Sequence, residues 1–143
     1  MNESDFPEDT TFGVIGICGA NCNLVARILK DRGFDVIGTD MSSGDDCRFK
    51  KSLEGYDIEV FYESHPEEFF EKVDYIIPPI SLPKTAEVFD IIQEKNIPVL
   101  EVSDIIDIFK VNKPVFGITG TNGKTTTTTL LKKIAYDNNI APV

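Results

Sequence analysis

Short apolar runs alternate with amphipathic segments along most of the chain. The first run, residues 12–18, predicts a strand that is buried on both faces. Apolar side chains then recur at helical spacing over residues 24–29 and Gly33 follows as a stop signal, so a helix is expected here. A second strand is predicted over residues 34–39, and the polar residues 41–46 after it are expected to form a loop.

The alternation continues to the C-terminus. Further strands are predicted over residues 58–62, 74–77, 98–102 and 114–119, and further helices over residues 66–72, 84–95, 104–110 and from Lys124 onward. The last helix is expected to bury Leu130, Leu131 and Ile134. Alternating strands and helices at this spacing form right-handed βαβ units, so the predicted fold class is α/β, a mainly parallel sheet with flanking helices. Ligands bind such sheets at the C-terminal ends of the strands, which points to the loops after Cys18, Thr39 and Thr119.

Composition narrows the class of partner. The 143 residues are 41% hydrophobic and carry a formal net charge of −10. This charge argues against a nucleic-acid surface and against an anionic membrane, whereas a phosphate ligand can still be held by backbone N–H groups and one lysine. The N-terminus lacks the layout of a signal peptide, and no apolar run approaches the roughly 20 residues of a membrane span, so a cytoplasmic location is expected.

The three cysteines, Cys18, Cys22 and Cys47, are odd in number and form no CxxC pair. Reduced and mostly structural thiols are therefore expected. A zinc site is not expected, because three thiols and the distant His65 lack metal-ligand spacing. His65 precedes Pro66 at a predicted helix start, where a surface or capping role is expected.

The strongest chemical signal lies between the last predicted strand and the last helix. The segment reads Thr119, Gly120, Thr121, Asn122, Gly123, Lys124, Thr125, Thr126. Its glycines allow successive N–H groups to face one concavity, and the helix N-terminus adds a positive end. Lys124 is predicted to reach the β- and γ-phosphates of ATP, and the Thr125 hydroxyl to bind Mg²⁺. The GxxxxGK[ST] pattern departs at its first position, Ile118; a helix-capping turn would explain the glycines without explaining the lysine and threonines.

The second signal is the turn after the first strand, which reads Gly16, Ile17, Cys18, Gly19, Ala20, Asn21. A dinucleotide fingerprint requires glycine at positions 18 and 21, so the spacing argues against NAD. It leaves open an anion site and a plain strand-to-helix turn. Asp40 ends the second strand, where an acidic residue commonly binds a ribose or base, and where a turn-forming role is the alternative.

The segment from Gly117 to Leu130 resembles the ATP-binding loop of the Mur ligases, including the replaced first glycine. Residues 16–22 resemble the glycine-rich turn of the muramate–alanine and muramoylalanine–glutamate ligases, and residues 36–40 and 96–100 follow the same family's order. The resemblance covers residues 12–136 and implies three segments: a flexible N-terminus (1–11), a Rossmann-like domain (12–112) that binds the UDP part of a substrate, and the start of a truncated central ATP-binding domain (113–143).

The resemblance also implies residue roles. Residues facing the uridine diphosphate would be Gly16, Ile17, Cys18, Gly19 and Ala20, while Asp40 and the backbone near Met41 would read the uracil or ribose. Residues 121–124 would hold ATP, with Lys124 as the catalytic residue and Thr125 on Mg²⁺. The implied reaction phosphorylates the carboxylate of a UDP-linked sugar or peptide precursor, and the amine of an amino acid then attacks the acyl phosphate. Cys18 and Asn21 stand where the family usually has glycine, which would alter the approach of the diphosphate or indicate a different UDP-linked substrate.

About seventeen residues follow Thr126. The Mg²⁺-binding glutamate, the carbamylated lysine and the amino-acid-binding domain of such ligases would lie beyond Val143, so the chain is expected to bind a uridine nucleotide without ligating. The alternatives are an unrelated P-loop NTPase, a non-catalytic nucleotide sensor of the same fold and a nicotinamide-dependent domain. A folylpolyglutamate synthase would begin with its nucleotide loop, which a hundred residues precede here.

Overall fold

The computed structural model describes residues 3–109 and 116–140. They belong to two compact units, Met1–Lys110 and Val111–Val143, which are called unit 1 and unit 2 below. Unit 1 contains four strands, β1 (Thr11–Ile15), β2 (Asp35–Asp40), β3 (Glu59–Tyr62) and β4 (Tyr75–Ile77). Its helices are η1 (Glu3–Asp5), α1 (Ala20–Asp31), α2 (Lys50–Gly55), α3 (Glu67–Glu71), α4 (Val88–Glu94) and α5 (Val102–Ile108). In unit 2 the described residues form one helix, α6 (Lys124–Asp137).

The strands of unit 1 form one parallel sheet in the order β3-β2-β1-β4. The central strand β1 pairs Val14 with Gly38 of β2 on one side and with Ile77 of β4 on the other. A single parallel bridge from Ile76 to Val99 continues the sheet beyond β4. Strands β2 and β3 therefore lie on one side of β1 and β4 lies on the other, so the strand order reverses between β1 and β4. The predicted α/β, Rossmann-like class is confirmed.

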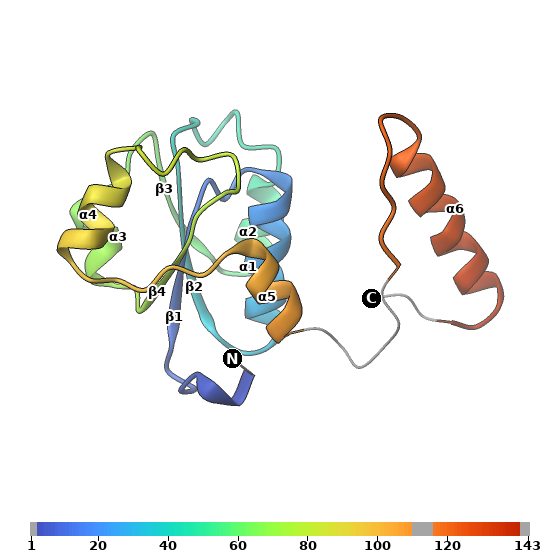
Figure 1. The fold of residues 1–143 in the computed structure, drawn as a ribbon, viewed down its shortest axis with the longest axis horizontal. Helices are drawn as coiled ribbons and strands as arrows, with labels where there is room; N and C mark the ends of the chain where they lie inside the picture. The colour runs from blue at the N-terminus through green and yellow to red at the C-terminus, as the bar shows by residue number, and fades with distance from the viewer. Residues whose placement is uncertain (1–2, 110–115, 141–143) are drawn as a thin grey trace. The chain divides into compact units, whose positions relative to one another are not determined.

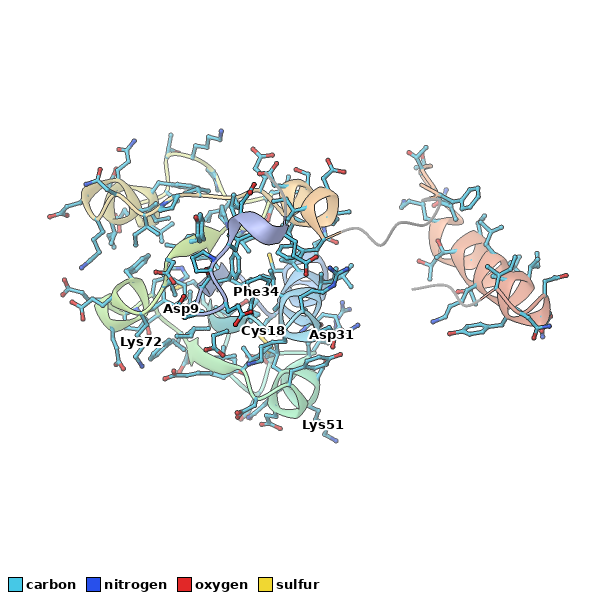
Figure 2. All side chains as sticks on the ribbon, turned by 90° about the horizontal axis from the view of Figure 1, so that it is seen from below. Asp9, Cys18, Asp31, Phe34, Lys51 and Lys72 are labelled. Carbon is cyan, nitrogen blue, oxygen red and sulfur yellow. A yellow bond between two sulfur atoms is a disulfide. The ribbon has the colours of Figure 1, made fainter. Side chains whose placement is uncertain are left out.

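Helices cover both faces of this sheet, with α1, α2 and α5 on one face and α3 and α4 on the other (Figure 1). Alternate residues of β1 supply the two cores: Phe12 and Val14 pack toward α1, whereas Ile15 packs with Phe69 of α3. A Cβ at Gly13 would lie 2.9 Å from the Phe69 ring, so the glycine lets α3 approach the sheet. Charged side chains such as Lys51 and Lys72 point outward (Figure 2).

The N-terminal residues 3–10 join the core of unit 1 through Phe6, whereas a flexible segment was predicted over residues 1–11, of which residues 1 and 2 lie outside the described part. Phe6 is buried and makes edge or stacked contacts with four rings, those of Phe12, Phe34, Tyr75 and Phe109. An aromatic residue buries a large apolar area, so one phenylalanine suffices to dock a short segment. Arg32 adds an ion pair to Glu3 and donates a hydrogen bond to the Phe109 carbonyl.

Two predicted strands are wrong within the described residues. Over residues 98–102 the chain makes only the Val99 bridge, because helix α5 begins already at Val102, where the Asp104 carboxylate caps it by accepting the Glu101 N–H at 2.8 Å. Residues 116–119 are not a strand, and residues 114 and 115 lie outside the described residues. Helix α2 was not predicted, because only Leu53 in this polar segment is buried.

The burial predicted for the last helix is also wrong. Leu130, Leu131 and Ile134 are 56%, 45% and 56% exposed. The described part of unit 2 is one helix and its preceding loop, so it offers no sheet against which these side chains can pack. Among the residues that the structure describes, no helix is long and apolar enough to cross a membrane.

Candidate nucleotide-binding site

The glycine-rich turn after β1 is held tightly against the end of β2. The N–H groups of Gly16 and Ile17 both donate to the Thr39 carbonyl, at 2.8 and 3.3 Å. Gly16 has a φ of 67°, which a residue with a side chain rarely adopts, and its ideal Cβ would lie 3.1 Å from Pro79 Cγ. The loop after β4 therefore closes on the turn, and Gly16 makes that approach sterically acceptable.

This turn lies where the strand order reverses, which is the usual ligand position on an open α/β sheet. Helix α1 begins directly after it with Gly19 as N-cap, and the first intrahelical bond runs from the Asn23 N–H to the Gly19 carbonyl. The N–H groups of Ala20, Asn21 and Cys22 therefore have no acceptor within the helix. Because Gly19, Ala20 and Asn21 are exposed, the positive end of α1 faces solvent and suits an anion.

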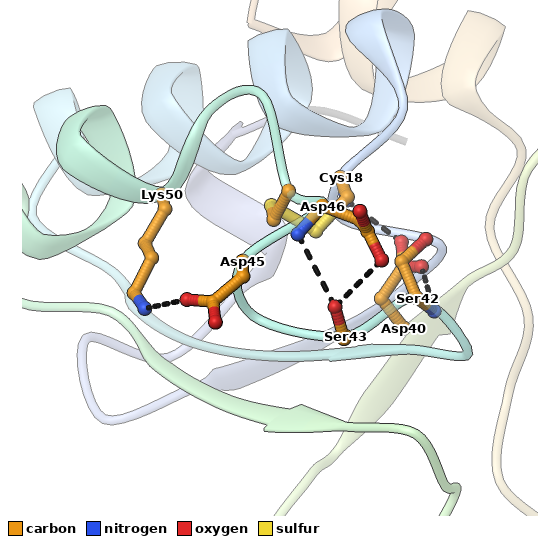
Figure 3. Close-up of a disulfide and its surroundings, with 8 residues drawn as sticks. Cys18, Asp40, Ser42, Ser43, Asp45, Asp46 and Lys50 are labelled. Carbon is orange, nitrogen blue, oxygen red and sulfur yellow. Dashed lines mark hydrogen bonds and ion pairs between the residues drawn. A yellow bond between two sulfur atoms is a disulfide. The ribbon is translucent and has the colours of Figure 1, made fainter.

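Asp40 joins the turn to the next loop. Its carboxylate is buried, at 7% exposure, and accepts the Cys18 N–H and the Ser42 N–H, both at 2.8 Å (Figure 3). Each carboxylate oxygen thus already accepts a hydrogen bond from a backbone N–H. The Asp40 side chain therefore fixes the turn after β1 to the loop after β2. Contact with a uracil or ribose stays a prediction for Asp40 and for the backbone near Met41, whose side chain is exposed.

His65 belongs to this edge of the sheet, although the sequence suggested only a surface or capping role. The Thr39 hydroxyl donates to the Ser64 carbonyl at 2.5 Å and lies 2.9 Å from His65 Nδ1. Since the hydroxyl has one proton, Nδ1 is the donor of the second bond, which leaves Nε2 as an acceptor. Burial lowers the pKa of His65, and the negative charge of Asp40 offsets part of that effect. Only the parallel pairing of β2 with β3 brings these residues together.

The predicted thiol state is wrong for two of the three cysteines. Cys18 of the glycine-rich turn and Cys47 of the loop after β2 form a disulfide (Figure 3). The sequence separates them by 29 residues, and only the parallel pairing of β1 with β2 brings the two following loops together. Cys22 is a free, buried thiol; burial, with a smaller contribution from Asp40, raises its pKa to about 11. In the described residues no group of three potential ligands is placed to hold a metal.

In unit 2 the predicted ATP-binding loop leads straight into α6. Gly123 is the N-cap with a φ of 79°, and the Lys124 ammonium folds back onto the Gly120 carbonyl at 2.7 Å. The hydroxyls of Thr128 and Thr129 donate to the carbonyls four residues earlier, which accounts for the later threonines without a ligand. A glycine N-cap, an adjacent lysine and a 14-residue helix fit a phosphate group, so the roles of residues 119–126 stay predictions that this geometry suits.

Comparison with known proteins identifies the family. The chain is 33% identical over 129 residues to the UDP-N-acetylmuramate–L-alanine ligase of Dictyoglomus turgidum, across 90% of this chain and 27% of that protein. A pseudomurein peptide ligase type C from Methanothermus fervidus matches with a TM-score of 0.69 and 36% identity, across 90% of this chain and 26% of that one. The chain belongs to the Mur ligase family. The resemblance noted in the sequence is confirmed.

The fold of this Mur ligase chain also matches the UDP-N-acetylmuramate–alanine ligase of Thermotoga maritima, with a TM-score of 0.74 at 20% identity over 88% of this chain and 29% of that one. No protein-family model matches the sequence. The chain spans 27% to 30% of the length of the first curated relatives. These relatives therefore establish the family of this chain and leave its own substrate to be tested.

Proposed function

We propose that this chain is the substrate-binding and ATP-loop portion of an ATP-dependent ligase that adds an amino acid to a UDP-linked cell-wall precursor. The proposal rests above all on likeness over nine tenths of the chain to a muramate–alanine ligase and a pseudomurein peptide ligase. Two features of the chain support it: the exposed N-terminus of α1, which lies where the strand order reverses, and a Gly-Lys-Thr turn that begins a second helix.

The uridine nucleotide is assigned to unit 1. Its diphosphate would accept hydrogen bonds from the free N–H groups at the start of α1, in a turn that Gly16 and Gly19 keep open. The uracil or ribose would lie toward the loop after β2, which begins at Met41. The same edge carries the Nε2 acceptor of His65, which suits the N–H of a uracil better than a second phosphate.

ATP and Mg²⁺ are assigned to the turn in unit 2. Lys124 would leave the Gly120 carbonyl to reach the phosphates, and the Thr125 hydroxyl would bind Mg²⁺. ATP supplies the phosphoryl group that activates the carboxylate of the precursor, after which the amine of an amino acid displaces phosphate. Other parts of such a ligase would bind that amino acid.

Calorimetry with UDP, with NADH as the competing class of ligand, tests the first assignment. UDP is expected to bind and NADH is not. Gly19→Asp places a carboxylate at the start of α1 and is expected to weaken UDP binding by about tenfold or more. Gly55→Asp is the matched control, since a Cβ at Gly55 meets nothing within 4 Å. Equal loss in both variants, or binding of NADH instead of UDP, would refute the uridine site.

The ATP assignment needs its own measurement. Lys124→Ala is expected to abolish binding of a fluorescent ATP analogue in the presence of Mg²⁺. Lys133→Ala, in the same helix and also exposed, serves as the control and is expected to leave binding unchanged. Retention of the analogue by the Lys124→Ala protein would contradict the role of this loop.

A further inference from the structure

The Cys18–Cys47 disulfide covalently ties the proposed uridine site to the loop beside it. Cys18 lies inside the glycine-rich turn, and Cys47 ends the polar part of the loop over residues 41–49. The Cα atoms of the two cysteines are 5.2 Å apart. Cys47 is buried against the core that includes Leu53, so the bond fixes the far end of the loop onto the turn (Figure 3).

The remaining contacts of this loop are weak. Ser43 and Asp46 bond to one another within the loop, and Asp45 pairs with Lys50 at 3.4 Å as an exposed ion pair. Pairs of this kind contribute about 0–1 kcal/mol because water screens them. A backbone bond from Glu63 to Ser42 at 3.3 Å and the Asp40 contacts hold the beginning of the loop. Beyond Ser42, the disulfide is the strongest tie to the turn among the described contacts.

The loop brings negative charge to a site that would receive an anion. From Asp40 to Cys47 the sequence contains three carboxylates, Asp40, Asp45 and Asp46, and no basic residue. The Cα of Asp46 lies within about 9 Å of the Cys18 Cα, because consecutive Cα atoms are about 3.8 Å apart. Because this upper bound is comparable to the Debye length at physiological salt, the Asp46 charge would act on a diphosphate bound at the turn. The nearest following cation, Arg48, lies over the Phe49 ring at 5.3 Å, and Lys50 pairs with Asp45. This leaves Asp40 and Asp46 as the charges of the loop nearest the turn.

We propose that Cys18 and Cys47 form a reversible redox switch. In the oxidised state the disulfide holds the acidic loop on the turn and weakens uridine-nucleotide binding. Reduction releases the loop and strengthens that binding. This rests on the proposed function of unit 1. The reductant is a dithiol: one of its thiolates attacks the sulfur of Cys18, which is half-buried whereas Cys47 is buried, and its second thiol completes the exchange. The dithiol loses two electrons and two protons, Cys18 and Cys47 gain them, and a small disulfide reverses the step.

One observation and one expectation from the sequence favour a switch over a permanent crosslink. Cys22 is 2% exposed in helix α1, so it is withheld from exchange and the reaction stays confined to one pair. The cytoplasmic location expected from the sequence is a reducing compartment, in which the disulfides that form are usually transient or redox-sensing.

The test is calorimetry of UDP with the whole chain, oxidised with glutathione disulfide or reduced with dithiothreitol. Reduction is expected to strengthen UDP binding by about fivefold or more, which is the lower end of the coupling between linked sites. Cys47→Ser is expected to bind tightly and to lose the redox dependence, whereas Cys22→Ala retains it. Asp46→Asn is expected to improve binding to the oxidised protein more than to the reduced one.

Hydrogen exchange of residues 41–49 separates the two proposals. Faster exchange on reduction, together with tighter UDP binding, supports the switch. Equal UDP affinity in both states, tighter binding when oxidised, or unchanged loop exchange overturns it. Absence of UDP binding in both states, with a folded protein and a loop that still opens, refutes the uridine site itself and thereby the regulatory role.

Discussion

Replacing Gly38 by alanine is expected to destabilise unit 1 and to displace the glycine-rich turn. Gly38 is buried in the middle of β2, opposite Val14. An added Cβ would lie 2.4 Å from Ile17 Cδ1, 2.8 Å from Cγ2 and 3.1 Å from Cβ. The terminal Cδ1 can rotate away about χ2, but Cγ2 moves only if χ1 leaves its rotamer, and no side-chain rotation moves Cβ. Ile17 must therefore move, and it carries the turn with it.

The magnitude follows from this overlap. Overpacking of a filled core costs about 1–3 kcal/mol. The lower entropy of alanine in the unfolded chain offsets about 0.4–1 kcal/mol of that cost. The expected net destabilisation is therefore on the order of 1–2 kcal/mol. Gly55→Ala is the matched control: its Cβ meets nothing within 4 Å at the end of α2, so it is expected to be neutral or slightly stabilising.

Urea unfolding followed by tyrosine fluorescence measures this change, because three of the four tyrosines, Tyr56, Tyr62 and Tyr75, lie in unit 1. All variants are compared in the same redox state. Ile17→Val removes Cδ1 and on its own is expected to cost about 0.5–1.5 kcal/mol. In the Gly38→Ala background it relieves the closest contact and is expected to cost at least about 0.5 kcal/mol less. Additive effects, or a Gly38→Ala protein as stable as Gly55→Ala, would show that Ile17 does not confine Gly38.

Three further predictions concern other parts of unit 1. Phe6→Ala removes a buried ring from the aromatic cluster and is expected to cost about 3 kcal/mol in urea unfolding; a loss below about 0.5 kcal/mol would mean that the N-terminal segment is undocked. Because burial lowers the pKa of His65 in the folded protein, that protein binds fewer protons than the unfolded chain below about pH 6.5. Its stability is expected to fall as pH drops from about 6.5, and His65→Gln is expected to remove that component; an NMR titration midpoint at or above about 6.5 for this single histidine would contradict the argument. In the native oxidised protein no thiol is expected to react with a disulfide reagent at about pH 8, because burial raises the pKa of Cys22 to about 11, and one thiol is expected to react after unfolding; rapid native reaction would contradict its burial.

Sequence patterns predicted the elements that repeat a simple rule. The strands β1 to β4 and the helix α1 follow apolar periodicity, and the parallel sheet follows from their alternation with helices. The pattern failed where one contact decides the structure. Residues 98–102 are apolar enough for a strand, yet the Asp104 cap begins a helix at Val102. Local periodicity contains no information about such a cap competing with a strand edge.

The site was predictable to the extent that loops follow strands. Gly16, Asp40 and the residues after them were placed at one edge by the rule for parallel sheets, and the structure brings them together. The disulfide and the His65–Thr39 contact depend on which strands are neighbours, and spacing along the chain does not specify that. Cysteine parity gave the wrong thiol state because parity cannot distinguish three free thiols from one pair and one free thiol.

Cys18 stands at a position where a dinucleotide-binding fingerprint requires glycine. In a fingerprint with glycine at this position the backbone can approach a pyrophosphate closely. Here the Cys18 N–H is already bound by the Asp40 carboxylate, and Gly16 and Ile17 donate to Thr39. The free donors for a diphosphate would therefore be the N–H groups of Ala20, Asn21 and Cys22, two to four residues later at the start of α1. The occupied Cys18 N–H and the disulfide are thus expected to have the same effect, since both disfavour close contact of a diphosphate with residues 16–18.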